Sequence, residues 1–185
     1  MPASQRKMMR LIMKEKRASL FHNCPDAGEK IVTLFFEFFD LPLSTIVGGY
    51  WPIGSEFDIK PLLNKLNEKG FKCALPSITS EGLIFRLWSS STFLEKGVFQ
   101  VLEPPSTAPV VIPHVLLVPL LAFDKEGHRL GYGQGHFDRF LHHHQVLTIG
   151  VGFKDQEVEN IPRQAHDFAL DYILTEEKLI ISRPF

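Results

Sequence analysis

One stretch constrains the fold of this chain more than any other. An apolar run from Val115 to Leu121 leads into a loop that reads Arg129-Leu-Gly-Tyr-Gly-Gln-Gly-His-Phe-Asp138, with glycine at alternate positions. The residues that follow, 136 to 144, are expected to form a short helix. In an open α/β sheet, ligands bind beyond the carboxyl ends of the strands. The stretch therefore predicts a buried strand that ends at a ligand-binding loop.

The residue types in this loop favour phosphate binding. Glycines at 131, 133 and 135 let backbone N–H groups face an anion, and the helix that follows would direct its positive end toward the same anion. Arg129 adds a cation suited to phosphate, and Asp138 is placed to hold a metal ion that accompanies a polyphosphate. The loop matches neither the P-loop nor the dinucleotide fingerprint, so a plain glycine-rich turn is the alternative.

Helical and strand-like segments alternate along the rest of the chain, which predicts an α/β domain with a largely parallel sheet. A length of 185 residues fits one domain. The expected helices are Ser4 to Leu20, Ala27 to Phe39, Ile59 to Lys69 and Phe93 to Gly97. The expected strands are Thr45 to Tyr50, Phe71 to Leu75, Leu83 to Trp88, Val115 to Pro119, Val146 to Phe153 and Ala169 to Leu174, with a turn over Pro76 to Gly82.

Two groups of side chains are candidates for a ligand site, and each has a plain alternative. Arg6, Lys7 and Arg10 on the first helix form either a solvated face or one wall of an anion site. Trp51 and Glu56 follow the first expected strand and offer a stacking face and a hydrogen-bond acceptor for a flat heterocycle. The alternative is that the tryptophan is a core residue and the glutamate caps a helix.

Other reactive residues have ordinary explanations. Asp171 is a lone acid in an apolar strand, so it lies at an exposed edge or is paired. The three consecutive histidines at 142 to 144 point in different directions on a helix, which favours a solvated helix end over a metal site. Cys24 and Cys73 lie far apart and are expected to be reduced thiols.

Composition excludes several classes of function. A formal net charge of −1 with 44% apolar residues is typical of a soluble globular protein and disfavours binding to nucleic acid through bulk charge. No apolar run approaches the roughly 18 residues of a membrane span, and the first residues do not resemble a secretory signal. We expect a cytoplasmic monomer that has neither nucleic acid nor a membrane as a partner.

The glycine loop also resembles a known family. Its surroundings fit the pattern F-D-x-x-G-x-R-L-G-x-G-x-G-[YF]-[YF]-D, which is similar to the signature of the 5-formyltetrahydrofolate cyclo-ligases. His136 stands where that family usually has an aromatic residue. The matching positions are Phe123, Asp124, Gly127, Arg129, Leu130, Gly131, Gly133, Gly135, Phe137 and Asp138.

The beginning of the chain resembles a second family segment. Cyclo-ligases carry an N-terminal K-x-x-L-R motif that contacts ATP, and Arg6-Lys-Met-Met-Arg10 occupies its place. Arginine stands for the lysine and Met9 for the leucine. Because an arginine keeps the charge but not the shape of a lysine, Lys7 is an alternative for this contact.

Two more segments resemble the family in the same order along the chain. Trp51 and Glu56 match a Y-x-x-x-x-E segment that holds the folate in the family. The resemblance therefore implies that these two residues contact the pterin end of the folate. The residues from Asp171, which read DYILTE, match a segment whose aspartate is a second magnesium contact. The resemblance therefore implies that Asp138 and Asp171 hold Mg²⁺.

The resemblance implies a three-layer α/β/α fold, similar to the sugar-phosphate isomerase and CoA-transferase group, with one cyclo-ligase domain over residues 1–185. It also implies that ATP and Mg²⁺ drive the conversion of 5-formyltetrahydrofolate to 5,10-methenyltetrahydrofolate through an N5-iminium phosphate. Arg10 and Arg129 would act in catalysis. The implied ATP contacts are Arg6, Lys7, Arg10, Arg129, Leu130, Gly131, Tyr132, Gly133, Gln134, Gly135, His136 and Phe137.

Two other functions fit the same residues. One is a divergent relative that binds a nucleotide but has a different folate activity or none. The other is a non-catalytic ligand-sensing domain, which would have no need of two acids for a metal. Measuring ATP turnover with and without folate distinguishes the three.

Overall fold

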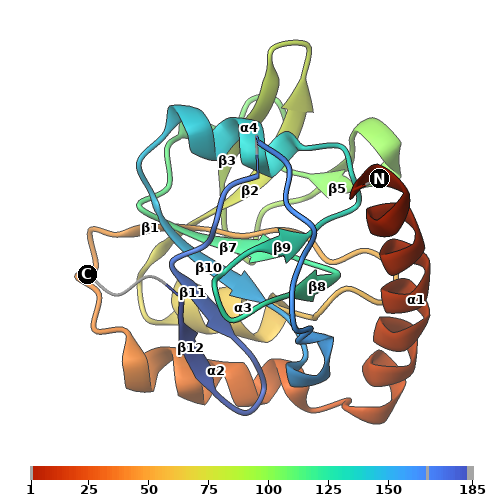
Figure 1. Cartoon of the computed structure of the whole chain (residues 1–185). Helices are drawn as coiled ribbons and strands as arrows, with labels where there is room; N and C mark the ends of the chain where they lie inside the picture. The colour runs from red at the N-terminus through yellow and green to blue at the C-terminus, as the bar shows by residue number, and fades with distance from the viewer. Residues whose placement is uncertain (1, 166, 183–185) are drawn as a thin grey trace.

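The computed structural model describes residues 2–165 and 167–182, and its elements alternate as the sequence predicts (Figure 1). The helices are α1 (Pro2–Asn23), α2 (Ala27–Phe38), α3 (Lys60–Glu68) and α4 (His136–His143), with short 3-10 turns η1 (Val98–Gln100) and η2 (Lys154–Gln156). The strands are β1 (Ile46–Gly48), β2 (Lys72–Thr79), β3 (Gly82–Trp88), β4 (Glu95–Lys96), β5 (Leu102–Glu103), β6 (Val110–Val111), β7 (Val115–Pro119), β8 (Ala122–Phe123), β9 (Arg129–Leu130), β10 (Leu147–Val151), β11 (Tyr172–Leu174) and β12 (Leu179–Ile181).

Eight strands of the described chain form the main sheet, in the order β12-β11-β10-β7-β1-β2-β3-β6. The five adjacent strands β11, β10, β7, β1 and β2 are parallel to one another. Antiparallel pairing occurs only toward the edges of this sheet, at β12, β3 and β6. The expectation of an α/β fold with a largely parallel sheet is confirmed.

Helices cover both faces of this sheet. Successive side chains of its central strand, β7, point to opposite faces, and each face packs in its own apolar cluster. Val115 and Leu117 of β7 pack in the cluster that contains the apolar faces of α2 and α3. Leu116 and Val118 pack in the cluster that contains Phe140 of α4. This alternation is the period of two expected of a strand that is buried on both faces. The result is the expected three-layer arrangement, with α4 and α2 on opposite sides of the sheet (Figure 1).

Helix α1 belongs to neither layer. It runs along one side of the molecule, next to the small sheet of β8 and β9 (Figure 1). Met13 of this helix packs against Leu121 and Ala122, which directly follow β7, and against Ile161. Helix α1 therefore lies at the carboxyl end of the central strand, where a ligand site is expected. Within the described residues, none of the helices has the length and apolar character needed to cross a membrane.

The strand order places a crevice beside β1. The chain leaves β1 to form β2 on one side and later returns to form β7 on the other side. The loops that follow β1 and β7 therefore diverge at their carboxyl ends. A change of direction of this kind is where open α/β sheets bind ligands.

Two local predictions are wrong. The turn expected over Pro76 to Gly82 is shorter, because β2 continues through Pro76 and Thr79 before the chain turns into β3. The register of β1 ends opposite Ala74, so no strand on that side needs the missing N–H of the proline. The helix expected over 93–97 is instead part of a hairpin, in which Gly97 donates its N–H to Val101 O at 2.8 Å. Strand β12 was not predicted.

Candidate functional site

A cavity of about 320 Å³ lies at the carboxyl ends of β1 and β7. Its walls differ in chemistry. One wall is polar and contains Arg6, Arg10, Arg129, Asp138, Asp167 and the glycine loop from Gly131 to Phe137. Another part of the lining is largely apolar and contains Trp51, Ile53, Ile78, Leu83, Val98, Phe99 and Val101, with Glu56 among them. Such a site suits a ligand or ligand pair with an anionic end and a flat apolar end.

The glycine loop has a backbone that other residues would not adopt easily. Gly133 and Gly135 have φ values of 101° and 66°, in the left-handed region, and Gly135 directly precedes α4. A Cβ atom on Gly133 would also lie 3.2 Å from the guanidinium carbon of Arg10. The Nε of Arg10 donates to Gly131 O at 2.8 Å, so α1 is fastened to the loop. The sequence prediction of a glycine loop that leads into a helix is confirmed.

Arg129 and Asp138 form a pair at opposite ends of this loop. Arg129 Nη2 donates to Asp138 Oδ1 at 2.9 Å, and its Nη1 donates to Phe168 O at 3.1 Å. The guanidinium is 5% exposed, and burial lowers its pKa while the charge of Asp138 opposes that shift. Asp138 Oδ1 also accepts from Phe168 N at 3.2 Å. The pair therefore fixes one carboxylate oxygen.

Arg6 lies beside an acid that the sequence argument missed. Its Nη1 donates to Pro162 O at 2.8 Å and forms an ion pair with Asp167 Oδ2. That oxygen also accepts from Gln164 N at 2.8 Å. Asp167 lies in an irregular segment with no periodic pattern. Its one sequence signal is that it follows the carboxyl end of β10, where the fold places its ligands.

Three of the predicted site residues do not line the cavity. Lys7 is exposed, so of the two alternative cations the structure brings Arg6 to the cavity. Leu130 is fully buried and packs with Met13 beneath the loop. Asp171 lies just before β11, and its Oδ2 accepts from Thr148 N at 2.8 Å and Thr148 Oγ1 at 2.7 Å.

Asp171 lies away from the cavity that contains Asp138. It precedes a parallel strand, so it lies at the amino end of β11, whereas the cavity lies beyond the carboxyl ends of β1 and β7. The expected partner of Asp138 at the cavity is not brought there by the fold. Asp167, four residues earlier in the chain, lines the cavity instead. A metal role for Asp171 stays a prediction, which its place at the other end of the sheet disfavours.

The loop after β1 places Trp51 and Glu56 on the cavity wall. The ring of Trp51 meets that of Trp88 edge-on, with centroids 5.9 Å apart, and is partly buried. Glu56 is 5% exposed, and its Oε2 accepts from Ile53 N at 2.9 Å. Burial raises the pKa of Glu56, and that hydrogen bond and the charge of Arg17 oppose the shift.

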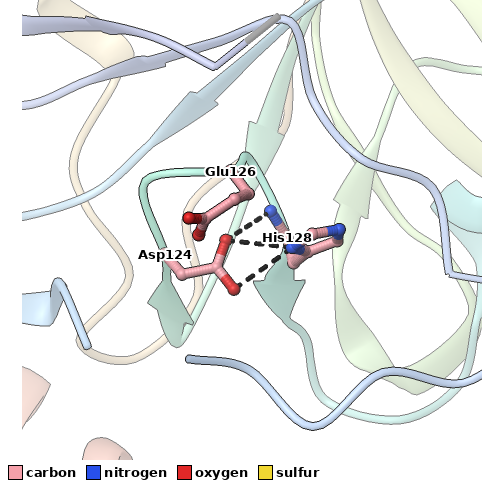
Figure 2. A group of neighbouring side chains, drawn as sticks. All are labelled: Asp124, Glu126 and His128. Atoms are coloured by element: carbon pink, nitrogen blue, oxygen red, sulfur yellow. Dashed lines mark hydrogen bonds and ion pairs between the residues drawn. The ribbon is translucent and has the colours of Figure 1, made fainter. Parts of the chain in front are cut away.

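A separate group of possible metal ligands lies outside the cavity. The ligand atoms of Asp124, Glu126 and His128 fall within 4.8 Å of one another. Figure 2 shows that the contacts join Asp124 to His128 and that none reaches Glu126. Asp124 Oδ1 accepts from His128 N at 2.9 Å and lies 3.1 Å from its Nδ1, while Oδ2 accepts from Ile161 N at 3.0 Å. Both oxygens of this buried acid are used within the chain, which makes the group a structural turn.

Comparisons with known proteins agree with one another. The model of the 5-formyltetrahydrofolate cyclo-ligase family matches residues 3–176. The cyclo-ligase of Mycolicibacterium smegmatis is 34% identical over 150 residues, which cover 74% of this chain and 76% of that protein. The cyclo-ligase of Escherichia coli K12 is 26% identical over 179 residues, which cover 91% and 98%. The NMR structure of Aquifex aeolicus 5,10-methenyltetrahydrofolate synthetase superposes with a TM-score of 0.86 at 29% identity, over 97% of this chain and 94% of that one.

Proposed function

The chain belongs to the 5-formyltetrahydrofolate cyclo-ligase family, and from that membership we propose that its cavity holds ATP and 5-formyltetrahydrofolate together. The reaction is the ATP-dependent cyclisation of 5-formyltetrahydrofolate to 5,10-methenyltetrahydrofolate, with ADP and phosphate as the other products. The observation that carries the assignment of the site is the mixed lining of the cavity, because arginines and the glycine loop share one space with aromatic and aliphatic side chains.

The chemical difficulty is that an N-formyl group is a poor electrophile and its oxygen is a poor leaving group. In the proposed sequence, the formyl oxygen attacks the γ-phosphorus of ATP and ADP leaves, which gives an N5-iminium phosphate. The N10 amine then attacks the formyl carbon, loses its proton and closes the ring. The carbon–oxygen bond breaks and phosphate departs with the former formyl oxygen. Such a transfer requires mainly positioning and neutralisation of charge from the protein.

The polar wall would hold the triphosphate. The loop from Gly131 to Gly135 offers backbone N–H groups just before α4, whose amino end favours an anion. Arg10 and Arg129 flank this loop and keep their positive charge, and Arg6 adds a third cation. Because Arg10 and Arg129 are already held by Gly131 O and Asp138, they would meet the phosphates with little further ordering.

The apolar wall would hold the folate. The Trp51 ring provides a face for the flat pterin, and Ile53 and Phe99 extend the apolar surface beside it. Glu56 supplies a hydrogen-bond acceptor for pterin N–H groups when it is ionised. With the pterin at Glu56 and the triphosphate at the glycine loop, the formyl oxygen would lie toward the γ-phosphate.

The acids on the polar wall fit Mg²⁺. Hydrogen bonds and ion pairs among the described residues engage Oδ1 of Asp138 and Oδ2 of Asp167, and each acid has a second oxygen without such a contact in that part of the chain. Both acids line the cavity. Mg²⁺ favours oxygen ligands and is commonly held by one or two carboxylates together with substrate phosphates. Bound there, it would neutralise charge on the phosphates. We assign this role to Asp138 and Asp167 in place of Asp171.

The test is to mix the purified protein with 5-formyltetrahydrofolate, ATP and Mg²⁺ and to follow the absorbance of the methenyl product together with ADP. We expect both to form in equal amounts and only when all three components are present. Folded protein that binds ATP but forms no methenyl product would instead favour the divergent relative. We also propose that residues 1–185 act as one domain in a cytoplasmic monomer, which gel filtration and limited proteolysis would test.

A further inference from the structure

Arg17 is a buried cation that neither the sequence motifs nor the proposed reaction uses. It is 2% exposed and lies in the C-terminal third of α1. With Arg6, Arg10 and Met13 it forms the spacing i, i+4, i+7 and i+11, which is one face of a helix. Lys16, its neighbour in the chain, is exposed. The face that presents Arg6 and Arg10 to the cavity therefore ends at a third arginine.

The guanidinium of Arg17 contacts three loops at the carboxyl edge of the sheet. Its Nε donates to Ser55 Oγ at 3.3 Å, in the loop that carries Trp51 and Glu56. Its Nη1 lies 3.5 Å from Leu120 O, just after β7. Its Nη2 donates to the hydroxyl of Tyr132 in the glycine loop, and its carbon lies 5.3 Å from the centre of that ring. A planar group with donors in a fixed fork suits such a junction.

We infer that Arg17 is a positioning residue for the cyclisation: it holds the folate loop, through Ser55, in register with the nucleotide loop, through Tyr132. The inference rests on the proposed function of those two loops. Each substrate would contact its own loop, so the contacts of either one alone depend little on Arg17. The distance between the formyl oxygen and the γ-phosphorus depends on both loops. Small errors in that distance lower the rate strongly.

The charge of Arg17 has a second consequence at Glu56. Three titratable or charged side chains interact with this buried acid: Arg17 from α1, Tyr132 from the glycine loop and Tyr50 just after β1. Burial raises the pKa of Glu56, and Arg17 opposes the rise. Burial raises the pKa of each tyrosine further above its ordinary value, so both stay neutral at pH 7. Removing Arg17 would therefore leave Glu56 protonated at a higher pH.

The experiment compares Arg17→Met with Lys16→Met, which removes an exposed cation from the same helix turn. Thermal unfolding first establishes that each variant is folded. Titration calorimetry then gives the affinity for ATP, and steady-state kinetics with the methenyl readout gives kcat and KM as a function of pH. For Arg17→Met we expect kcat to fall about 100-fold, with ATP affinity changed less than about 3-fold. The acid limb of kcat/KM for the folate should move to higher pH, and Lys16→Met should match the wild type.

Two further variants separate positioning from support of the fold. Arg17→Lys keeps the positive charge and one hydrogen-bond donor that can extend toward Tyr132. Its kcat should therefore lie between those of Arg17→Met and the wild type. Tyr132→Phe should lower kcat in the wild type but much less in Arg17→Met, because the two residues act through one contact. If Arg17→Met does not fold, the double variant of Ser55→Ala and Tyr132→Phe tests the same link with Arg17 in place.

The outcomes are distinct. Wild-type kcat in folded Arg17→Met, or in that double variant, would overturn the inference while the proposed function stood. A wild-type protein without methenyl formation would overturn the proposed function, and the inference with it.

Discussion

Two groups of acidic residues in this molecule have similar side chains, but they differ in how many carboxylate oxygens already accept a hydrogen bond or form an ion pair. In the turn between β8 and β9, Asp124 accepts hydrogen bonds on both oxygens from His128 and Ile161. At the cavity, the contacts that Asp138 and Asp167 make with the rest of the described chain fall on one oxygen each. Both groups contain carboxylates near basic side chains. The first group completes its contacts within the chain, and the second leaves oxygens available to a ligand.

The number of carboxylate oxygens that remain free of contacts therefore distinguishes a structural acid from an acid available to a ligand, without reference to sequence motifs. A buried carboxylate whose acceptors are all used has no capacity left for a metal ion, and its removal costs stability. A carboxylate held by one oxygen is oriented at little cost and keeps the other for a cation.

The strongest test is to neutralise a cavity acid. We expect Asp138→Asn to lower kcat by about 10³-fold, because charge on the transferred phosphate would lose its metal contact. The midpoint of thermal unfolding should fall modestly, since the amide keeps an oxygen for Arg129 but removes the charge that offsets the burial of that guanidinium. Glu126→Gln, in the β8–β9 turn, is the matched control and should keep wild-type kcat. Equal activity in Asp138→Asn and the wild type would remove the distinction between the two groups.

Neutralising the turn acid should have the opposite profile. Asp124→Asn sets an NH₂ group against N–H donors in a fully buried place, so the free energy of unfolding should fall by about 3 kcal/mol. Urea denaturation measures this value. Turnover per folded molecule should change only a few-fold. If Mg²⁺ or Zn²⁺ raised the unfolding midpoint of the wild type and not of Asp124→Asn, the turn would be a metal site after all.

A third test compares two cations on α1. Arg10→Met should weaken ATP binding about 10- to 100-fold, because a charge-assisted hydrogen bond to phosphate is worth roughly 1.5–3 kcal/mol. Lys7→Met should bind ATP as the wild type does, since Lys7 is exposed and lies outside the cavity lining. Titration calorimetry in the absence of folate gives both affinities. A larger loss from Lys7→Met would reverse the assignment of this helix.

The smallest expected effect concerns Glu56, whose pKa is raised by burial. An acid with a raised folded-state pKa binds its proton more readily when folded, so stability from this group falls as the pH rises through that pKa. At pH 8 the folded wild type contains a buried ionised carboxylate, which lowers its free energy of unfolding, whereas the side chain of Glu56→Gln is uncharged. We expect Glu56→Gln to unfold at a higher temperature at pH 8, with an advantage that shrinks in acid. An advantage that grew in acid would contradict the assigned direction.

The sequence predicted much of this architecture because the relevant signals are local. The apolar run before the glycine loop forms β7, and the helix predicted over Ala27 to Phe39 is α2. The loop residues from Gly131 to Phe137 line the cavity as expected. Pro76 misled the prediction, because proline is tolerated where a neighbouring strand has already ended and the sequence does not reveal where that is.

The parts of the site that escaped prediction depend on contacts between distant segments. Asp171 was proposed from a short motif, but it precedes β11 and so lies at the end of the sheet away from the cavity. Asp167 had only its place after β10 to indicate it. Arg17 was within reach of sequence reasoning, since helical spacing puts it on the same face as Arg6 and Arg10. Its partners, Ser55 and Tyr132, are 38 and 115 residues away in the chain.

The central claim is that the cavity brings the formyl oxygen of the folate to the γ-phosphate. The most direct measurement follows that oxygen: 5-formyltetrahydrofolate labelled with ¹⁸O in the formyl group is converted with ATP and Mg²⁺, and the released phosphate is analysed by mass spectrometry. We predict one ¹⁸O in each phosphate molecule for each methenyl product formed. Methenyl product accompanied by unlabelled phosphate would show that ATP is cleaved without attack by the formyl oxygen, and would contradict the account.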